Sequence, residues 1–392
     1  MFRACILVFL ALASLACADN EPQSVDDYIL AVERPLNGDG EELDSLTLPE
    51  LMDEFNVPGV SLAIISDFAV HWAKSYGIAD VESGAEVNTS TLFQAASISK
   101  PVVAMAVLKA VENGDFTLDT NINEILTSWR LPDSRFTAEQ PVTPRSLTSH
   151  TSGLGDGFGF PGYHPDDPTP TTVQILNGEA PSNVGPVLME RSPLVAMKYS
   201  GGGVTMMELA LEDATGKPIR EIMQDYVLNP IEMSLSTFEQ PLSKERDRNA
   251  ARAHDENGEA MDAKWHVYPE FAAAGLWTTP TDLAKFVIEV QKSVHGRANR
   301  VLLPSTIQEM LNPVGVGEFA VGFTISKRGE GWYFDHGGSN WGFRGLLVGH
   351  KLKGYGLVVM TNADQGSLLI DEISKRVAKV YSWDTLDEPI AR

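Results

Sequence analysis

Cysteine is almost absent from this sequence of 392 residues. Its two cysteines, Cys5 and Cys17, both lie close to the N-terminus. Beyond that segment the chain therefore has no disulfide framework, no thiol nucleophile and no thiolate metal site. The eight histidines show no metal-ligand spacing and no His-Glu-x-x-His motif, and no phosphate-binding glycine loop is evident. We expect neither a metal nor another cofactor.

Basic residues and long apolar runs are also scarce. Lys and Arg number 30 against 53 Asp and Glu, which gives a formal net charge of −23. Such a surface repels nucleic acid and anionic lipid, so we expect no nucleic-acid partner. The apolar run at residues 4–16 is shorter than the roughly 20 residues that a membrane-spanning helix needs. We therefore expect no membrane span.

The N-terminal segment has the pattern of an export signal. Arg3 precedes the apolar run, and small residues around Ala16 and Ala18 follow it. We predict a signal peptide over residues 1–18 and a secreted or periplasmic protein. Two alternatives stay open: a buried N-terminal helix, and a lipoprotein signal in which Cys17 carries a lipid anchor.

The order of the predicted elements indicates two lobes. Strand patterns occur early, at residues 60–66 and 69–78, and return between residues 319 and 361. We expect an α/β (α+β) fold, with an antiparallel sheet flanked by helices and built from both chain ends, plus a mostly helical second lobe. The predicted bounds are an acidic linker at 19–42, the sheet lobe at 43–130 and 266–392, and the helical lobe at 131–265.

The strongest helix pattern begins at Ser97. Residues 97–113 are apolar almost all round, which is typical of a buried helix. Ser97 and Lys100 are three residues apart and share one face, and the helix N-terminus offers N–H groups to a developing oxyanion. Burial favours the neutral form of an amine, so Lys100 would accept the Ser97 proton. The pair alone also occurs by chance, as a capping serine beside a solvated lysine.

Three motifs in order resemble those of the active-site-serine β-lactamases and penicillin-binding proteins. These enzymes carry Ser-x-x-Lys, then Tyr-x-Asn or a variant, then Lys-Thr-Gly or His-x-Gly. The resemblance extends over about residues 45–382 and includes the class C and related esterase branch. The matching segments are 97–100, 199–201 and 336–338, with further similarity at 149–154, 275–280 and 358–362.

The resemblance implies roles for the matching residues. Ser97 would be acylated, and Lys100 and Tyr199 would share the proton transfers, with Tyr199 the base for the attacking water. Which of the two is the base in the first step stays open. His336 would lie beside the polar group of the substrate and help to orient Tyr199. The backbone N–H groups of Ser97 and Ser339 would form the oxyanion hole.

Two positions depart from the family pattern. Gly201 stands where the family often has Asn, and His336 replaces the Lys that would bind a substrate carboxylate. Histidine is mostly neutral at pH 7, so carboxylate binding would be weaker. Both changes favour an esterase or peptidase over a dedicated β-lactamase. Gly337, Gly338 and Arg344 are further candidates for contacts with the substrate.

Weaker candidates surround these motifs. His150 is expected to support the fold through hydrogen bonds rather than to catalyse. Aromatic residues nearby are candidates for a lid or for a pocket wall, with core packing as an equal interpretation for the wall. The lid candidates are Phe158, Phe160 and Tyr163, and the wall candidates are Trp265, Tyr268, Phe271, Trp341 and Phe343.

We therefore expect a secreted or envelope serine hydrolase that forms an acyl-enzyme on Ser97 and hydrolyses a small-molecule ester, amide or peptide. A carboxylesterase or D-amino-acid peptidase ranks before a true β-lactamase, and acyl transfer to another acceptor is an alternative. The absence of Gly-x-Ser-x-Gly disfavours an α/β-hydrolase. Alternatives of another class are a penicillin-binding sensor that is acylated without turnover and an envelope interaction module. The oligomeric state stays open.

Overall fold

The computed structural model describes residues 24–36, 42–156, 159–329 and 331–383. The predicted signal peptide, Cys17 and Phe158 lie outside these described residues. Within the described ranges, none of the helices combines the length and the apolar character that a bilayer crossing demands.

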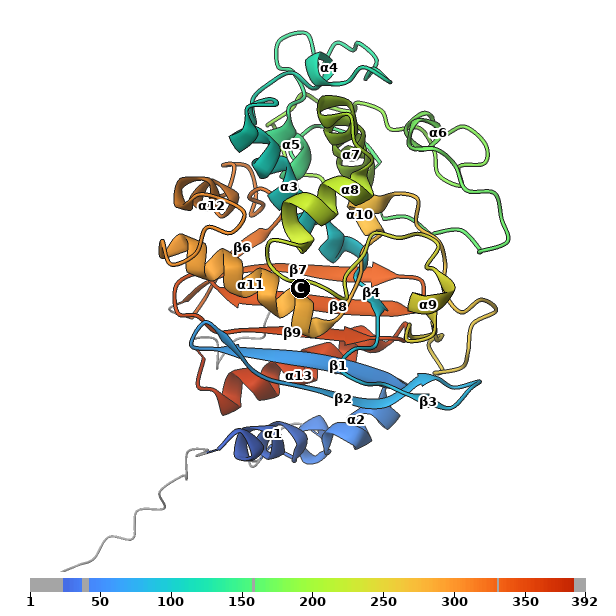
Figure 1. Ribbon diagram of the computed structural model, residues 1–392, viewed down its shortest axis with the longest axis vertical. Coiled ribbons are helices and arrows are strands. Elements are labelled where there is room, and N and C mark those ends of the chain that lie inside the picture. The colour runs from blue at the N-terminus through green and yellow to red at the C-terminus, as the bar shows by residue number, and fades with distance from the viewer. Residues whose placement is uncertain (1–23, 37–41, 157–158, 330, 384–392) are drawn as a thin grey trace, which may run out of the picture.

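A seven-stranded antiparallel sheet lies at the centre of the molecule (Figure 1). The strand order is β3-β2-β1-β9-β8-β7-β6, so strands from the two chain ends meet where β1 pairs with β9. The predicted sheet built from both ends of the chain is confirmed. Its strands are β1 (Gly59–Ser66), β2 (Ala69–Asp80), β3 (Ala85–Glu86), β6 (Thr324–Arg328), β7 (Gly331–Asn340), β8 (Phe343–His350) and β9 (Gly356–Thr361).

Helices cover both faces of this sheet (Figure 1). In β1, Leu62 and Ile64 contribute to the core beneath α13 (Gly366–Val380), whereas Ala63 and Ile65 contribute to the core beneath α11 (Pro280–Val294). Neighbouring residues of a strand point to opposite faces, so a strand covered on both sides is apolar throughout. This explains why β1 and β9 show no alternation of apolar and polar residues.

The segment expected to be an acidic linker contains a helix, α1 (Val25–Glu33). Ser24 and Asp27 form a capping box at its start, and Val32 is buried against the α13 side of the sheet. Arg376 of α13 secures this segment, because its guanidinium donates to backbone carbonyls that include those of Arg34 and Leu46, at 2.9 and 2.6 Å. The linker prediction was wrong here because the acidic residues mask a short apolar stripe.

The buried helix α3 (Ser99–Asn113) connects the sheet to a group of helices at one end of it (Figure 1). Its buried residues include Lys100 as well as the apolar ones, in agreement with the pattern in the sequence. The remaining elements are η1 (Glu42–Ser45), α2 (Leu48–Glu54), β4 (Phe93–Gln94), η2 (Ala96–Ile98), α4 (Ile122–Ile125), α5 (Pro144–Thr148), α6 (Thr172–Asn177), α7 (Gly201–Thr215), α8 (Ile219–Met223), η3 (Gln224–Leu228), α9 (Lys244–Asp247), α10 (Phe271–Ala274), β5 (Trp277–Thr278) and α12 (Pro304–Met310).

Candidate active site

Ser97 lies in the short 3-10 turn η2, and α3 begins two residues later than the sequence indicated. Ala96, directly before it, has a φ of 51°, a region that residues with a Cβ rarely adopt. Such strain costs about 1–2 kcal/mol and persists where the surroundings fix the backbone. Ser99 helps to fix it, since its hydroxyl donates to the Ala96 carbonyl at 2.6 Å and accepts from the N–H of Leu276 at 3.0 Å.

Two adjacent glycines of β7 face different surroundings. A Cβ on Gly338 would lie 2.4 Å from the carbonyl oxygen of Ala95, so glycine allows the Ser97 turn to approach the strand closely. Gly345 on β8 is also tightly packed, with an ideal Cβ 3.1 Å from the side chain of Ile98. Gly337 instead faces open space, because the nearest atom to its Cβ position is 3.9 Å away. Gly338 therefore sets the position of the turn, whereas Gly337 leaves open space on the opposite face of β7.

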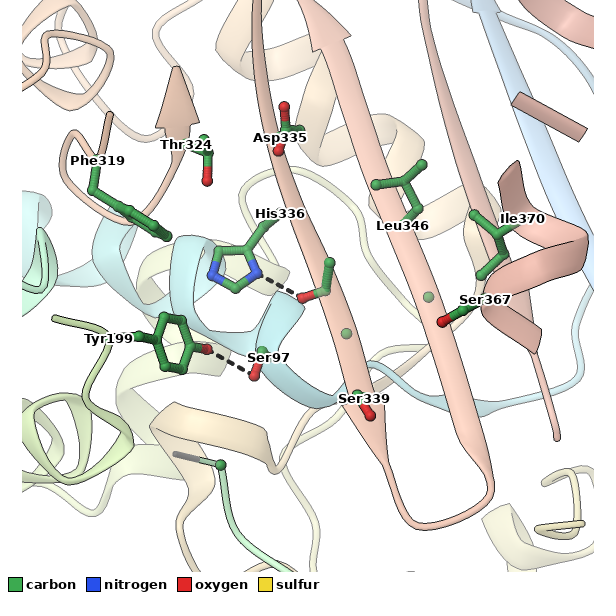
Figure 2. Close-up of a pocket in the computed structure, with 14 residues that line it drawn as sticks. Ser97, Tyr199, Phe319, Thr324, Asp335, His336, Ser339, Leu346, Ser367 and Ile370 are labelled. Carbon is green, nitrogen blue, oxygen red and sulfur yellow. Dashed lines mark hydrogen bonds between the residues drawn. The ribbon is translucent and has the colours of Figure 1, made fainter. Parts of the chain in front are cut away.

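Three residues predicted from the motifs meet at the Ser97 hydroxyl. Lys100 Nζ donates to Ser97 Oγ at 3.0 Å, and the Tyr199 hydroxyl donates to the same atom at 2.9 Å (Figure 2). Lys100 is only 3% exposed, and its second hydrogen bond goes to the carbonyl of Ala273 at 2.7 Å. The arrangement places the Ser97 hydroxyl beside two groups that are able to exchange protons with it.

His150 supports Tyr199 from the helical side. The two ring centres are 4.2 Å apart, and His150 Nδ1 accepts the N–H of Ser200 at 3.1 Å. Burial, followed by the charge of Lys100, holds the pKa of His150 well below its usual value, so the ring is neutral at pH 7. The structure thus gives His150 the supporting hydrogen bond expected from the sequence.

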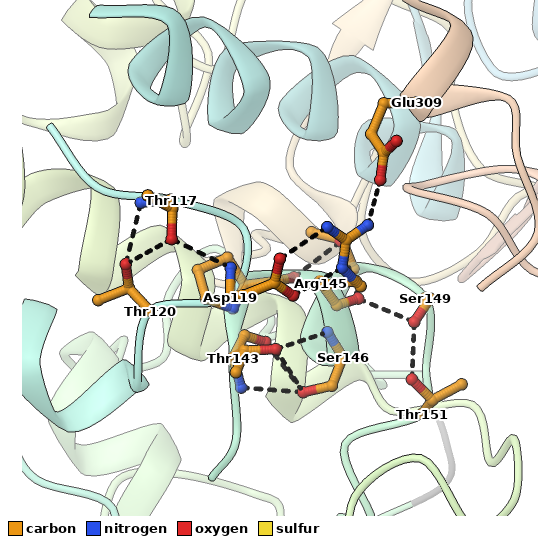
Figure 3. A network of polar contacts seen from close by, with 11 residues as sticks. Thr117, Asp119, Thr120, Thr143, Arg145, Ser146, Ser149, Thr151 and Glu309 are labelled. Atoms are coloured by element: carbon orange, nitrogen blue, oxygen red, sulfur yellow. Dashed lines mark hydrogen bonds and ion pairs between the residues drawn. The ribbon is translucent and has the colours of Figure 1, made fainter. Parts of the chain in front are cut away.

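The helix that precedes His150 is anchored by a network of polar contacts (Figure 3). Arg145 of α5 donates to both carboxylate oxygens of Asp119, at 2.8 and 2.9 Å, and to Glu309 of α12. Ser149 donates to the Arg145 carbonyl at 2.8 Å, and its hydroxyl lies 2.8 Å from that of Thr151. These bonds fix the backbone around His150, where φ is 58°.

Asp156 fixes the start of α7, directly after Tyr199. Its Oδ1 accepts from the Ser200 hydroxyl at 2.6 Å, and its Oδ2 accepts from the N–H of Gly202 at 2.8 Å. The Ser200 hydroxyl in turn accepts from the N–H of Gly203 at 2.8 Å. A carboxylate at a helix N-terminus satisfies free N–H groups and complements the helix dipole. The sequence carries no clear signal for this residue, which lies in a glycine-rich loop.

His336 forms part of the wall beside Tyr199 (Figure 2). Its Nδ1 lies 2.7 Å from the Gly337 carbonyl, which can only accept, so Nδ1 carries the proton. Its Nε2 is buried without a hydrogen-bond partner in the described part of the chain. Burial, and then the charge of Lys100, lowers the pKa of His336 to about 3, so the ring is neutral at pH 7. His336 and Tyr199 are neighbours through their rings, whose centres are 6.3 Å apart.

These groups face a pocket of about 410 Å³ beside Ser97. Figure 2 shows Phe319 next to Tyr199 and His336, and Leu346 and Ile370 on the other side of β7. Several of the lining residues carry no signal in the sequence, because they come from strands and loops that only the fold brings together. The lining residues are Ser97, Gly159, Tyr199, Phe319, Thr324, Asp335, His336, Gly337, Gly338, Ser339, Gly345, Leu346, Ser367 and Ile370.

The predicted site residues Lys100, Gly201 and Arg344 are not among those that line this pocket, and Lys100 reaches Ser97 from the buried side. Arg344 is held by Asp364, to which its Nη2 donates at 2.7 Å, and its Nη1 donates to the Asn340 carbonyl at 2.6 Å. Gly201 is the first residue of α7 and accepts at its carbonyl from Thr205. Arg344 therefore supports the turn that follows β7, and Gly201 forms the start of the helix after Tyr199.

The aromatic candidates are mainly packing residues. Phe160 and Tyr163 are buried, which is unlike an open lid, and Tyr268 is fully buried with its hydroxyl accepting the N–H of Trp341 at 2.9 Å. Trp265 is 5.9 Å from Trp277 between ring centres. In the described residues no cluster of His, Cys, Asp and Glu side chains is suited to a metal ion.

The antiparallel sheet, the buried helix behind Ser97 and the Ser-Lys-Tyr cluster define a protein of the β-lactamase fold, a fold of serine hydrolases. The Beta-lactamase family model matches residues 47–378, and the chain belongs to this family.

Proteins similar to this chain have diverse activities. Esterase EstB of Burkholderia gladioli is 26% identical over 297 residues, which cover 68% of this chain and 71% of the esterase. Penicillin-binding protein 4 of Amycolatopsis lactamdurans is 26% identical over 289 residues, which cover 72% of each chain. The solved structure of D-amino acid amidase from Ochrobactrum anthropi SV3 is similar in fold, with a TM-score of 0.68 at 22% identity, over 91% of this chain and 99% of the amidase.

Proposed function

We propose that this protein hydrolyses small esters or amides through an acyl-enzyme on Ser97, as a carboxylesterase or a D-amino-acid peptidase. The observation that carries the proposal is the convergence of Lys100 Nζ and the Tyr199 hydroxyl on Ser97 Oγ, at 3.0 and 2.9 Å. A serine hydroxyl becomes an effective nucleophile when a neighbouring group accepts its proton.

The proposed reaction has two halves. Ser97 Oγ attacks the carbonyl carbon while its proton passes to Lys100 or Tyr199, and the oxyanion is stabilised by the backbone N–H groups of Ser97 and Ser339. The carbon–oxygen or carbon–nitrogen bond breaks, and the leaving alcohol or amine takes up the proton. Water then attacks the acyl-enzyme, Tyr199 accepts a proton from it, and the acid leaves as Ser97 Oγ regains its proton.

The residues of the pocket favour esters and amides over β-lactams as substrates. A neutral His336 stands where the family often has a lysine for a substrate carboxylate. The similar EstB is an esterase and the similar amidase acts on amides by name, so both leaving groups are consistent with the fold. We further propose export to the periplasm or medium, on the basis of Arg3 and the apolar run after it, and N-terminal sequencing of the secreted protein tests this.

The test is a hydrolysis panel of p-nitrophenyl butyrate, a D-Ala-containing peptide and nitrocefin, with Ser97→Ala as the control. We expect turnover of an ester or of the peptide by the wild type and a loss of at least about 10³-fold in Ser97→Ala. Mass spectrometry after treatment with a fluorophosphonate should show one adduct, on Ser97. Unchanged activity in Ser97→Ala would refute the mechanism.

A second variant addresses the role of Tyr199. In Tyr199→Phe, a slowly hydrolysed ester should still label Ser97, but the adduct should clear about 10²–10⁴-fold more slowly, because the base for water is lost. An acyl adduct that never clears from the wild type would instead favour the sensor that binds without turnover.

A further inference from the structure

The wall of the pocket beside Ser97 carries no cationic side chain in the part of the chain that the structure describes. Its ionisable residues besides Tyr199 are Asp335 and His336, and the histidine is neutral. Asp335 is bound at 2.5 Å by the buried guanidinium of Arg328, so this pair adds no net charge. A carboxylate that enters the pocket therefore meets hydroxyls and a second carboxylate.

The basic side chains near the site are already engaged. Lys100 is almost fully buried, and its Nζ is bound to Ser97 and to the Ala273 carbonyl. Arg344 is paired with Asp364, in the turn before α13. The first turn of α13, where Ser367 reaches the pocket, adds only the partial charge of a helix N-terminus. None of these groups supplies a free cation to a ligand.

An apolar side chain, that of Phe319, lies on the Ser97 side of the pocket (Figure 2). Phe319 lies edge-on to Tyr199 and His336, with ring centres 6.2 and 6.1 Å away. Leu346 and Ile370 also line the pocket, but they belong to the core beneath α13, on the opposite face of the sheet, where each is only 2% exposed. An ester with an apolar group beside its carbonyl fits against the half-buried Phe319.

We propose that the site selects substrates that are uncharged around the reacting carbonyl, with an apolar group against Phe319, and rejects analogues with a carboxylate there. The inference rests on the proposed acyl-enzyme function and adds the substrate class. Its physical basis is that a carboxylate loses its hydration in the pocket without gaining a charged partner.

The experiment compares the methyl 4-nitrophenyl diester of trans-1,4-cyclohexanedicarboxylic acid with the mono-4-nitrophenyl ester, whose free carboxylate is held away from the reacting ester. We expect kcat/KM to be about 10- to 100-fold higher for the neutral ester. This factor corresponds to the free energy of one charge-assisted hydrogen bond with water, which the carboxylate loses without replacement. The preference should persist at about 1 M salt, which screens the general repulsion from the net charge of −23. Equal rates, or a preference that disappears at high salt, would overturn the proposal.

A matched pair of variants tests the cause. Ser367→Lys should raise the anionic-to-neutral ratio of kcat/KM by about tenfold, because it places a cation on the pocket wall, whereas Ser367→Met, of similar length, should not. An unchanged ratio in a folded Ser367→Lys protein counts against the proposal. Hydrolysis of both esters that survives Ser97→Ala would instead show that the proposed function itself is wrong.

Discussion

The two sides of the candidate site are held in place by different interactions. On the sheet side, Ser339 and His336 belong to β7, whose backbone pairs with β8 from Tyr333 to Asn340. The end of this strand is also tied down, because the side-chain amide of Asn340 donates to Gln94 at 2.8 Å. On the helical side, Tyr199 precedes α7 and depends on the side chains of Asp156 and His150.

The two sides differ in how many hydrogen bonds hold each of them in place. A strand ladder distributes its support over successive backbone groups, so no single polar side chain decides its position. The Tyr199 segment rests on a few side-chain hydrogen bonds, and the loss of one leaves buried partners unpaired. The sheet side should therefore be sensitive to steric changes in its glycines, and the helical side to changes in its polar groups.

Among the variants that compare the two sides of the site, Gly338→Ala is expected to have the largest effect on activity. The new Cβ would lie 2.4 Å from the Ala95 carbonyl, so the turn carrying Ser97 must move. We expect a loss of about 100-fold in kcat/KM and of about 1–3 kcal/mol in the free energy of unfolding. Gly337→Ala is the matched control, because its Cβ would enter open space. Urea denaturation and ester hydrolysis check both, and equal stability losses in the two variants would contradict the steric account.

Asp156→Asn should have a smaller effect, confined to the helical side. The amide keeps the size of the carboxylate but removes its charge and one acceptor from Ser200 and Gly202. We expect kcat to fall by about tenfold while KM changes little, because Tyr199 is less well oriented. The control is Asp225→Asn, an exposed carboxylate that binds Lys217 at 2.8 Å. If both variants kept full kcat, support of Tyr199 by Asp156 would be refuted.

Of these three variants, Glu270→Gln is expected to have the smallest effect on activity at neutral pH. Glu270 directly precedes α10, which packs against both η2 and α7 and so lies between the two sides. Neither carboxylate oxygen of Glu270 has a hydrogen-bond partner among the described residues, and burial raises its pKa to about 8 from a usual 4.5. The groups that face it are Glu208, Tyr163 and Tyr268.

The sign of the pH effect follows from these values. Between pH 4.5 and 8 the folded chain keeps a proton that the unfolded chain has lost, so the free energy of unfolding falls as pH rises. The stability advantage of Glu270→Gln over the wild type should therefore begin above about pH 4.5 and grow by on the order of 2 kcal/mol between pH 6 and pH 9. Thermal unfolding at the two pH values measures this, and a variant that is equally stable relative to wild type at both would contradict it.

Much of the fold and part of the site could be predicted from the sequence. The apolar run after Ser97 and the paired strand patterns depend on local periodicity, which the sequence displays directly. Ser97, Lys100 and Tyr199 were found because they lie in motifs, although Tyr199 is about a hundred positions away. Asp156 and Phe319 were missed because they lie in irregular segments whose positions depend on tertiary contacts. Arg344 was predicted to contact the substrate because its ion pair with Asp364, 20 residues later, has no signature in the sequence.

The pairing of β1 with β9 also constrains the order in which the chain folds. Val60 of β1 lies opposite Thr361 of β9, so the central sheet closes only after nearly the whole chain has been synthesised. The turn that carries Ser97 rests against β7 at Gly338, which also comes from the late part of the chain. A nascent or truncated chain that lacks its C-terminal strands consequently has the serine motif without the strand that positions it, so we expect the proposed activity only when synthesis is almost complete.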